Sequence, residues 1–323
     1  MDNLTHGLTG ALMAQTGLKK KTGLGLAALV LGANLPDIDV VGLLWLDSKE
    51  ALGFRRGITH GPIGVASLPI GLAALLWGFD RWQDGRGKRP EARLPVSFKW
   101  LYILGLIGAI SHSLMDWLNV YGVRFLYPFD KSWYYGDTLF IIDVWLWALL
   151  IVSVWWSARG EKRGDNWRKR AWVGVVAACA YVAMNWAFSS VIFVSAQSPK
   201  NYGPNTQVIA SPAPFAFWQR EILTKPPQSD WNQAFYSLGR SDHDDVPLTD
   251  QPCHLPDLSK QRATNSQLNG FLTWSRAPFA TRADDGSVIL RDARFTDPRV
   301  GDSFSLALPD VECVPIKREP PAG

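Results

Sequence analysis

Three of the five histidines lie in the apolar first half of the chain, each beside other polar groups. The candidate site residues of this half are His6, Asp37, Asp39, His60, His112 and Asp116. An aspartate in the interior of a bilayer costs about 2.5 to 3.5 kcal/mol on insertion scales, so such groups need compensation. Imidazole nitrogen with carboxylate oxygen is the ligand mixture expected for zinc or another divalent metal. The sequence therefore predicts a divalent metal site, with zinc as the expected ion.

Two parts of this set have a spacing that suits metal binding. His112 and Asp116 are four residues apart, so on a helix their side chains share one face. Asp37 and Asp39 directly follow a proline, which lacks a backbone donor and breaks or kinks a helix. Broken backbone at membrane depth is tolerated where it lines a cavity enclosed by protein. We therefore expect both aspartates to offer carboxylate oxygens at a helix break.

Each residue also has a structural interpretation. A single buried histidine such as His6 is more often a satisfied core residue than a ligand. His112 and Asp116 can form a hydrogen-bonded pair between packed helices. Asp37 can cap a helix near the break, which would leave only Asp39 to bind metal. The complete set favours a metal site over these separate interpretations.

The apolar stretches of the first half indicate membrane-spanning helices, because a span needs about 20 mostly apolar residues. Four segments meet this requirement: 62–79, 100–120, 139–158 and 171–196. Segment 24–46 has the length but contains the proline break, and segment 4–18 is short. We predict a mainly α fold, a polytopic transmembrane helical bundle with five or six membrane segments, some of them discontinuous.

The positions of Lys and Arg predict the orientation, since loops that stay in the cytoplasm carry the excess of both. Basic clusters at 81–99, 159–170 and Lys19–Lys21 should be cytoplasmic, whereas loop 121–138 should be outside. The alternation then places the amino terminus and everything after residue 196 outside. Localisation to the bacterial inner membrane, as a multi-pass protein, follows as the expectation.

This topology brings the candidate ligands to one depth. The helix that starts near Lys99 runs outward, so His112 and Asp116 lie near its outer end, and the other four candidates also fall on the outer side. A random scatter of polar residues would rarely converge in this way. Arg55 and Arg56, also on the outer side, form the one discordant basic pair.

The last part of the chain has a different composition from the first half, and its pattern predicts short strands. From Gln197 onward it is dense in Pro, Asp, Asn and Ser and shows no long helical period. Segments 271–274, 287–291 and 303–308 are short and partly alternating, so they are predicted as strands. Asp284-Asp285-Gly286 predicts a hairpin turn.

We therefore predict two domains, 1–196 in the membrane and 197–323 as a small β-rich extracytoplasmic domain. Cys253 and Cys313 can pair if this tail is outside, because disulfides persist in oxidising compartments. His243 and His254 are interpreted as solvated surface residues. The net charge of +4 comes from short clusters between apolar runs, so no nucleic-acid partner is expected.

Four motifs in order carry a resemblance to a known family. They are Met1–His6, Leu35–Asp39, Gly57–His60 and His112–Gly122. Over about residues 1 to 150 the sequence resembles the bacterial LexA-regulated, membrane-bound metal-dependent hydrolase family. Gly61 follows His60 where serine is usual in this family, but the histidine itself is kept. The resemblance implies an inner-membrane enzyme that uses a bound metal for hydrolysis.

The order His, Asp, His and then His-x-x-x-Asp is also similar to that of the zinc-dependent phospholipase C and single-strand nuclease superfamily. This phospholipase-like order implies one ion held by Asp37 or Asp39 with His60, His112 and Asp116, and a second shared by His6 and Asp116. The sequence shows no evident later His-x-x-x-Glu pair for a third ion. Asp137 and Asp143 either take that place or only pack.

The reaction that the resemblance implies is hydrolysis by a water whose pKa the metal lowers to about 7. Asp37, as a carboxylate not fully used as a ligand, is the predicted catalytic general base. The expected substrate is an ester or phosphoester of a lipid or lipid-linked molecule at the outer face of the inner membrane, with membrane lipids as partners.

The alternative function is a metal-binding membrane transporter or sensor without hydrolytic activity. It would need a polar route across the bilayer. The third and fourth clear spans offer little beyond Asp143, Asn185 and a few serines, so the hydrolase is the favoured hypothesis. A purely structural anchor for the tail would leave the clustered ligands unexplained.

Overall fold

The computed structural model describes residues 1–197, 205–227, 229–237, 246–297 and 301–316. Contacts between residues divide the chain into two compact units. The first unit comprises 1–40, 56–188 and 212–217, and the second comprises 41–55, 189–211 and 218–323. The second unit thus takes a segment from the first half of the sequence. The predicted domain division after residue 196 stays a prediction.

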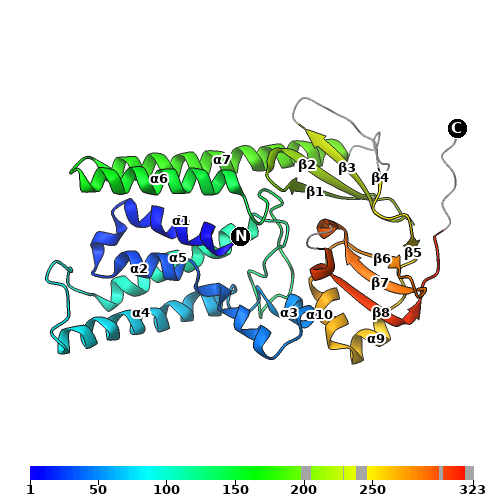
Figure 1. The fold of residues 1–323 in the computed structure, drawn as a ribbon, viewed down its shortest axis with the longest axis horizontal. Coiled ribbons are helices and arrows are strands. Elements are labelled where there is room, and N and C mark those ends of the chain that lie inside the picture. The colour runs from blue at the N-terminus through cyan, green and yellow to red at the C-terminus, as the bar shows by residue number, and fades with distance from the viewer. Residues whose placement is uncertain (198–204, 228, 238–245, 298–300, 317–323) are drawn as a thin grey trace. The chain divides into compact units, whose positions relative to one another are not determined.

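The first unit is helical, and its longer helices run side by side (Figure 1). Its elements are α1 (Asn3–Gln15), η1 (Leu18–Lys21), α2 (Gly25–Gly32), the start of η2 (Leu35–Leu44), α4 (Pro62–Gly85), α5 (Phe98–Trp117), α6 (Val144–Lys162) and most of α7 (Trp167–Ala196). Two helices begin at an aspartate whose side chain accepts hydrogen bonds from orphan backbone N–H groups, Asp2 for α1 and Asp143 for α6. Helix α5 packs between α2 and α4, and α1 packs on α2 and α6.

Three of the described helices are long and apolar enough to cross a membrane, namely α4, α5 and α7. A fourth span results if α2 and η2 count as one, because these two helices are bent by 52° at the break before Pro36. The predicted discontinuity is therefore confirmed. The short α1 and the tryptophan-rich α6 do not meet the same criterion in the described chain. Three or four spans are supported, and the larger count of five or six stays a prediction.

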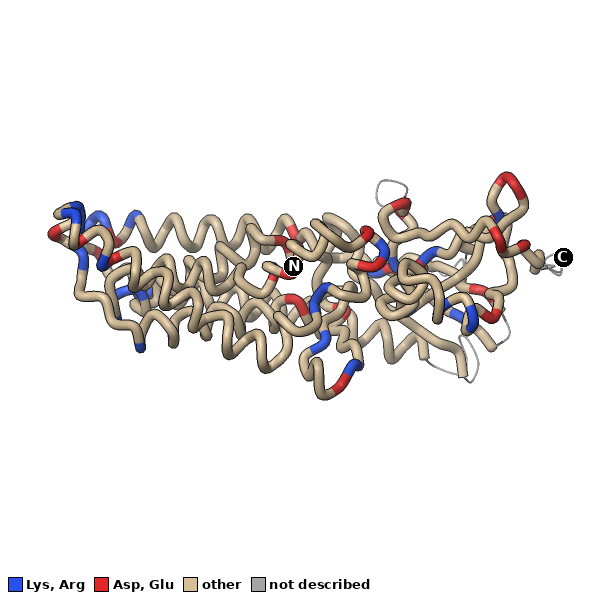
Figure 2. Tube along the Cα trace, turned by 90° about the horizontal axis from the view of Figure 1, so that it is seen from below, with Lys and Arg blue, Asp and Glu red and all other residues tan. Residues whose placement is uncertain are grey.

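The three basic clusters of the helical unit lie at one end (Figure 2). Lys19 pairs with Glu161, and Lys20 Nζ lies 3.7 Å from the other oxygen of that carboxylate. The backbone N–H of Gly23 donates to Pro95 O at 3.0 Å, which joins the turn after α1 to the loop after α4. The predicted grouping of these clusters on one side of the helices is confirmed.

Glycines allow α2 and α5 to approach closely. A Cβ atom on Gly32 would lie 2.6 Å from Gly105 O, and one on Gly108 would lie 2.6 Å from Ala33 N. Small residues at such contacts are typical of helix pairs in membranes. Because Gly108 lies one turn before His112, this approach sets the position of the polar end of α5.

Among its described residues, the second unit contains two four-stranded sheets, with strand orders β1-β2-β3-β4 and β5-β6-β7-β8. Its elements are α3 (Ser48–Phe54), β1 (Gln207–Ala213), β2 (Ala216–Lys225), β3 (Asn232–Ser237), β4 (Val246–Pro247), β5 (Pro252–Cys253), α9 (Ser259–Thr264), α10 (Ser266–Trp274), β6 (Pro278–Arg282), β7 (Ser287–Asp292), η3 (Ala293–Phe295), η4 (Gly301–Phe304) and β8 (Ser305–Glu312); β1 and β2 meet at 212–217, which group with the first unit. The β-rich character predicted for the tail is confirmed.

The strand predicted at 271–274 is wrong, because these residues end helix α10. Asn265 caps this helix by accepting the backbone N–H of Leu268. Leu268, Phe271 and Trp274 recur every third residue and are fully buried, as one face of a short helix requires. The four residues 271–274 alone do not show this helical spacing, because Leu268 lies before them.

The other strand predictions agree better with the structure. Segment 287–291 lies within β7, and 303–308 overlaps β8, although its first residues belong to η4. The hairpin turn at Asp284-Asp285-Gly286 is confirmed, with Gly286 at a φ of 87°. Asp285 Oδ1 accepts the backbone N–H of Ser287 at 2.9 Å.

A disulfide joins Cys253 to Cys313. It links β5 to the chain that follows β8, where His254 N donates to Val314 O and Ile316 N donates to Pro252 O. The pairing that the sequence left conditional is therefore present in the structure. Cys179, the third cysteine, is free.

Helix α3 packs on α10 within the second unit. The contact is a close backbone approach, since a Cβ on Gly270 would lie 2.5 Å from Lys49 O, and one on Gly53 would lie 2.8 Å from Gly270 O. Lys49 Nζ also donates to the carbonyl oxygens of Asp302 and Ser303 at 2.8 and 2.9 Å. Segment 41–55 is thereby tied to a part of the chain more than 200 residues away.

Gly108→Ala should lower the stability of the protein, because the added methyl group would meet backbone atoms of α2 that cannot turn aside as a flexible side chain can. Overpacking of this kind costs about 1 to 3 kcal/mol. Thermal unfolding of the purified protein in detergent measures the change. Gly71→Ala in α4 is the matched control, since nothing lies within 4 Å of a Cβ there. Equal melting temperatures for the two variants would contradict the role assigned to Gly108.

Candidate metal centre

Four of the six predicted site residues meet in one place in the helical unit. Asp37 comes from η2, His60 from the turn before α4, and His112 and Asp116 from the last part of α5. Each offers one ligand atom, and these four atoms all lie within 4.8 Å of one another. The side chains of His60, His112 and Asp116 are fully buried, whereas that of Asp37 is 11% exposed.

The separations between the ligand atoms are short and converge on a common point. His60 Nε2 lies 3.1 Å from His112 Nε2 and 3.2 Å from Asp116 Oδ2. His112 Nε2 lies 3.5 Å from Asp116 Oδ2 and 3.9 Å from Asp37 Oδ1. A zinc ion binds imidazole nitrogen at about 2.0 to 2.1 Å, which separates tetrahedral ligand atoms by about 3.3 Å. The donor set and its spacing therefore fit a divalent ion such as zinc.

The far side of the His112 ring is held by the backbone. His112 Nδ1 lies 2.7 Å from Ala33 O, at the glycine-mediated contact of α2 with α5. A hydrogen bond to this carbonyl requires the proton on Nδ1 and leaves Nε2 as the free acceptor that faces the group. Helix packing thus fixes both the position and the tautomer that metal binding needs.

Asp39 lies behind His60, outside the four-residue group. Its Oδ2 accepts the backbone N–H of Arg56 at 2.7 Å and the Thr59 hydroxyl at 3.3 Å, and lies 3.6 Å from His60 Nδ1. The Thr59 hydroxyl is itself 2.9 Å from that nitrogen. These contacts give Asp39 the place of a carboxylate that orients a ligand histidine.

His6 lies on the other side of Asp116. Its ring stacks on that of His112 with 3.7 Å between centroids, and its Nε2 is 3.3 Å from Asp116 Oδ1. His6 is 1% exposed; the neighbour of its Nε2 is Asp116 Oδ1, and its Nδ1 has no hydrogen-bond partner among the described residues. A buried histidine satisfied as an ordinary core residue would have such a partner. The structure thus places His6 at the edge of the group, beside the oxygen of Asp116 that His60 and His112 do not share.

Arg56 is the principal residue that the sequence did not single out for the site. Its Nε lies 3.0 Å from Asp116 Oδ2, and its Nη1 donates to Asn119 Oδ1 and Gly122 O. The guanidinium also covers the ring of Tyr121, 4.4 Å from its centroid. Arg56 therefore places a positive charge against Asp116 Oδ2, while the Met1 amino group pairs with Oδ1.

The burial of Arg56 accounts for one member of the basic pair that disagrees with the predicted orientation. Arg56 is 5% exposed and adopts a φ of 53°, a left-handed conformation that costs a side-chain-bearing residue about 1 to 3 kcal/mol. A guanidinium buried against a carboxylate does not act as a loop charge in membrane orientation. The sequence did hold one indication of this role: Arg56 is a basic residue on the side that the predicted topology places outside.

The remaining acidic and histidine candidates lie elsewhere. Asp143 caps α6 and accepts the Tyr181 hydroxyl at 3.0 Å, so packing accounts for it. Neither Asp143 nor Asp137 belongs to a group of three or more potential metal ligands within the described chain. His254 is exposed in the second unit, as its surface interpretation expects, and His243 lies outside the described residues.

A helical unit with apolar spans, which encloses a buried Asp, His, His and Asp group able to hold a metal ion, defines a class of integral membrane protein with a candidate metal centre. The profile of the YdjM inner membrane protein family matches residues 1–191. Because the match covers more than half of the sequence, the chain belongs to this family.

The chain is also similar to one curated protein. The uncharacterized protein YfhP of Bacillus subtilis (strain 168) is 25% identical over 132 residues, which are 40% of this chain and 36% of the relative. The chain therefore aligns with about a third of the length of that protein. No solved structure matches the chain.

Asp39→Asn should weaken metal binding without abolishing it, because it removes the charge that orients His60 through Thr59. The loss of such an outer carboxylate typically lowers affinity by about 10- to 100-fold. Competition with a zinc chelator measures the affinity of the purified protein. Asp84→Asn, which removes an exposed carboxylate at the opposite end of α4, is the control and should bind as the wild type does. Wild-type affinity in Asp39→Asn would rule out this orienting role.

Proposed function

We propose that the protein is a membrane-bound metal-dependent hydrolase that cleaves an ester or phosphoester of a lipid or lipid-linked substrate at the outer face of the inner membrane. The observation that carries this proposal is the buried group of Asp37, His60, His112 and Asp116. Two imidazoles and two carboxylates that converge within a few ångströms form a ligand set that suits a divalent cation.

A divalent ion, with zinc as the first candidate, would lower the pKa of a bound water to about 7 and polarise the bond under attack. His60, His112 and Asp116 would hold the ion, since each is fully buried and directed into the group. Arg56 and Asp39 would keep these ligands in place through their contacts with Asp116 and His60.

Asp37 suits the role of general base. It is the most loosely placed member, at 3.9 Å from His112 Nε2, and the only one of the four with an exposed part of its side chain. A base must approach the water that it deprotonates, within about 2.6 to 3.2 Å, and so cannot be sealed from solvent or fully used as a ligand.

A second ion would be shared by His6 and Asp116. The two oxygens of Asp116 face different partners. Oδ2 faces His60, His112 and Arg56, and Oδ1 faces His6 and the Met1 amino group. The Nδ1 of His6, which has no hydrogen-bond partner among the described residues, supports this extension, because a buried polar atom is otherwise left unsatisfied.

A lipid-like substrate is favoured by the place of the group along the helices. Helix α5 has 20 residues, so its two ends are about 30 Å apart, close to the thickness of the apolar core of a bilayer. Its first end lies near the basic clusters, and the metal ligands lie at the other. Ile38 and Val40, which flank Asp39, are 48% and 46% exposed and would face acyl chains there.

The proposed orientation rests on two observations: the basic clusters lie together at one end of the helices, which would be the cytoplasmic end, and the second unit contains a disulfide. A reporter fused after residue 323 tests it: alkaline phosphatase, which folds only outside the cytoplasm, should be active, and green fluorescent protein should be dark. The same two reporters fused after Gly87, in the loop after α4, should give the opposite result and serve as the control. A fluorescent fusion at the carboxyl end would contradict this orientation.

His112→Ala should remove both bound metal and hydrolysis, because it deletes a buried ligand. Asp37→Asn should lower turnover by about 100- to 10,000-fold while much of the metal is retained, the effect expected for loss of a general base. Metal content by mass spectrometry, and turnover of generic phosphodiester and phospholipid substrates in detergent, measure the two properties. His254→Ala, at an exposed histidine of the second unit, is the matched control.

Two results would count against the proposal. Stoichiometric metal in both His112→Ala and Asp116→Ala would refute the ligand assignment. Metal bound by the wild type and lost in His112→Ala, with no turnover of any ester or phosphoester by either protein, would favour the alternative of a transporter or sensor.

A further inference from the structure

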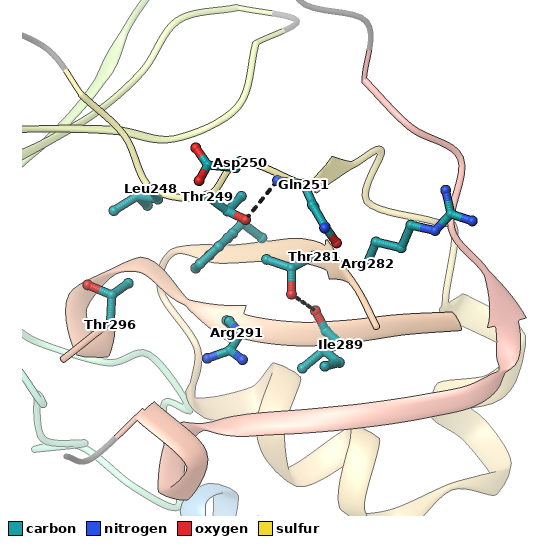
Figure 3. Close-up of a pocket in the computed structure, with 10 residues that line it drawn as sticks. Leu248, Thr249, Asp250, Gln251, Thr281, Arg282, Ile289, Arg291 and Thr296 are labelled. Atoms are coloured by element: carbon teal, nitrogen blue, oxygen red, sulfur yellow. Dashed lines mark hydrogen bonds between the residues drawn. The ribbon is translucent and has the colours of Figure 1, made fainter. Parts of the chain in front are cut away.

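The second unit contains a recess that the metal centre does not use. It has a volume of about 360 Å³ and lies over strands β6 and β7, beneath the segment 248–251 (Figure 3). A volume of this size is typical of sites for small ligands. A neighbouring recess of about 470 Å³ shares three of its lining residues, Asp250, Gln251 and Arg282.

The register of the sheet explains how the floor of the recess is formed. Phe279 is paired with Arg291, and Thr281 with Ile289, so these four side chains share one face of the β6–β7 pair. The opposite face is core, with Val288 and Leu290 fully buried. The floor therefore combines two apolar side chains with a hydroxyl and a guanidinium.

The rim above the floor is polar and held by hydrogen bonds. The backbone N–H of Arg282 donates to Gln251 O at 3.1 Å, and the backbone N–H of Gln251 donates to the Thr249 hydroxyl at 3.1 Å. Figure 3 shows Asp250 and Gln251 on this segment, across the recess from Thr281 and Arg291 on the strands. The rim thus presents a carboxylate and an amide opposite a guanidinium.

The arginines of the recess have no anionic partner in the described part of the chain. Arg291 is half-buried and Arg282 is exposed, and neither makes an ion pair or a side-chain hydrogen bond with the described residues, so it is Arg291 whose charge is partly desolvated. Arg294, only three residues further on, is buried and fully paired, with its Nε 2.7 Å and its Nη2 2.9 Å from the oxygens of Asp292. A partly desolvated guanidinium without a partner favours the binding of an anion.

We propose that this recess binds a small phosphorylated polyol. The phosphate would pair with Arg291, because a guanidinium group matches phosphate oxygens with charge-assisted, bidentate hydrogen bonds. Arg282, which is paired with Val288 and so extends from the other face of β6, lies at the edge that the two recesses share. Asp250, Gln251 and Thr296 would accept or donate hydrogen bonds to the hydroxyl groups. This site is independent of the hydrolase proposal, since it lies in the second unit and uses none of the metal ligands.

The carboxylate of Asp250 disfavours a ligand that carries negative charge at both ends. Such a ligand would meet a like charge on the rim, whereas a hydroxyl group is a good donor to a carboxylate. The polyol end and the phosphate end of one molecule therefore suit opposite walls of the recess. Because Arg282 lines both recesses, a longer polyol can extend from one into the other.

The test uses the full-length protein in detergent with glycerol 1-phosphate as the probe, followed by calorimetric titration. The wild type should bind it, and Arg291→Gln should weaken binding by at least about tenfold, as loss of a charge-assisted hydrogen bond implies. Lys260→Gln, which removes an exposed positive charge of the same unit, is the control for net charge and should bind as the wild type does. An unchanged melting temperature shows that Arg291→Gln is folded.

Two further probes separate the parts of the proposal. Inorganic phosphate should bind more weakly than glycerol 1-phosphate, and glycerol should not bind measurably. Dihexanoyl phosphatidylglycerol distinguishes the sources of the ligand: binding of the free phosphate ester alone assigns a soluble metabolite, and binding of both assigns a lipid headgroup. Equal affinity in the wild type and Arg291→Gln, no binding by the wild type, or phosphate as tight as the glycerol ester would overturn the proposal. His112→Ala should leave the affinity unchanged, which separates this site from the metal centre.

Discussion

The carboxylate of Asp116 has no contact with water, and much of the helical unit is arranged to compensate its charge. An isolated carboxylate in such a place would carry a desolvation cost of several kcal/mol. Three imidazoles and one guanidinium converge on it from α1, α5 and the turns before α4. Each of these groups must be buried to reach Asp116, so each in turn needs its own partner. The backbone carbonyl of Ala33 and the carboxylate of Asp39 meet that need for two of the histidines.

The parts of this centre that depend on local geometry could be predicted from the sequence. The four-residue spacing of His112 and Asp116 is a property of any helix, and the helix break at Asp37 follows from the adjacent proline. Arg56 could not be assigned in this way, because its left-handed backbone and its ion pair with a residue 60 positions away arise only from tertiary packing. The place of Asp39 behind His60 depends likewise on the hydrogen bond from the Arg56 backbone.

The second unit likewise contains elements that neighbouring residues determine and elements that depend on contacts between residues far apart in the sequence. The Asp-Asp-Gly turn specifies its hairpin because glycine alone adopts the required φ without strain. Residues 271–274 resemble a strand because the cap of helix α10 at Asn265 and its first buried residue, Leu268, lie before them in the sequence. The membership of α3 in this unit had no signal in the sequence, because it rests on the close approach of Gly53 and Gly270.

The polypeptide leaves the helical unit after Val40 and returns to it at Arg56, and between these points it belongs to the second unit. The two ends of this excursion carry Asp39 and Arg56, which the hydrogen bond between them holds together beside the centre. A chain cut after residue 196 would lack α10, so α3 would lose the helix on which it packs within the second unit. Segment 41–55, which joins Asp39 to Arg56 along the chain, therefore depends for its packing on residues that follow 196 in the sequence.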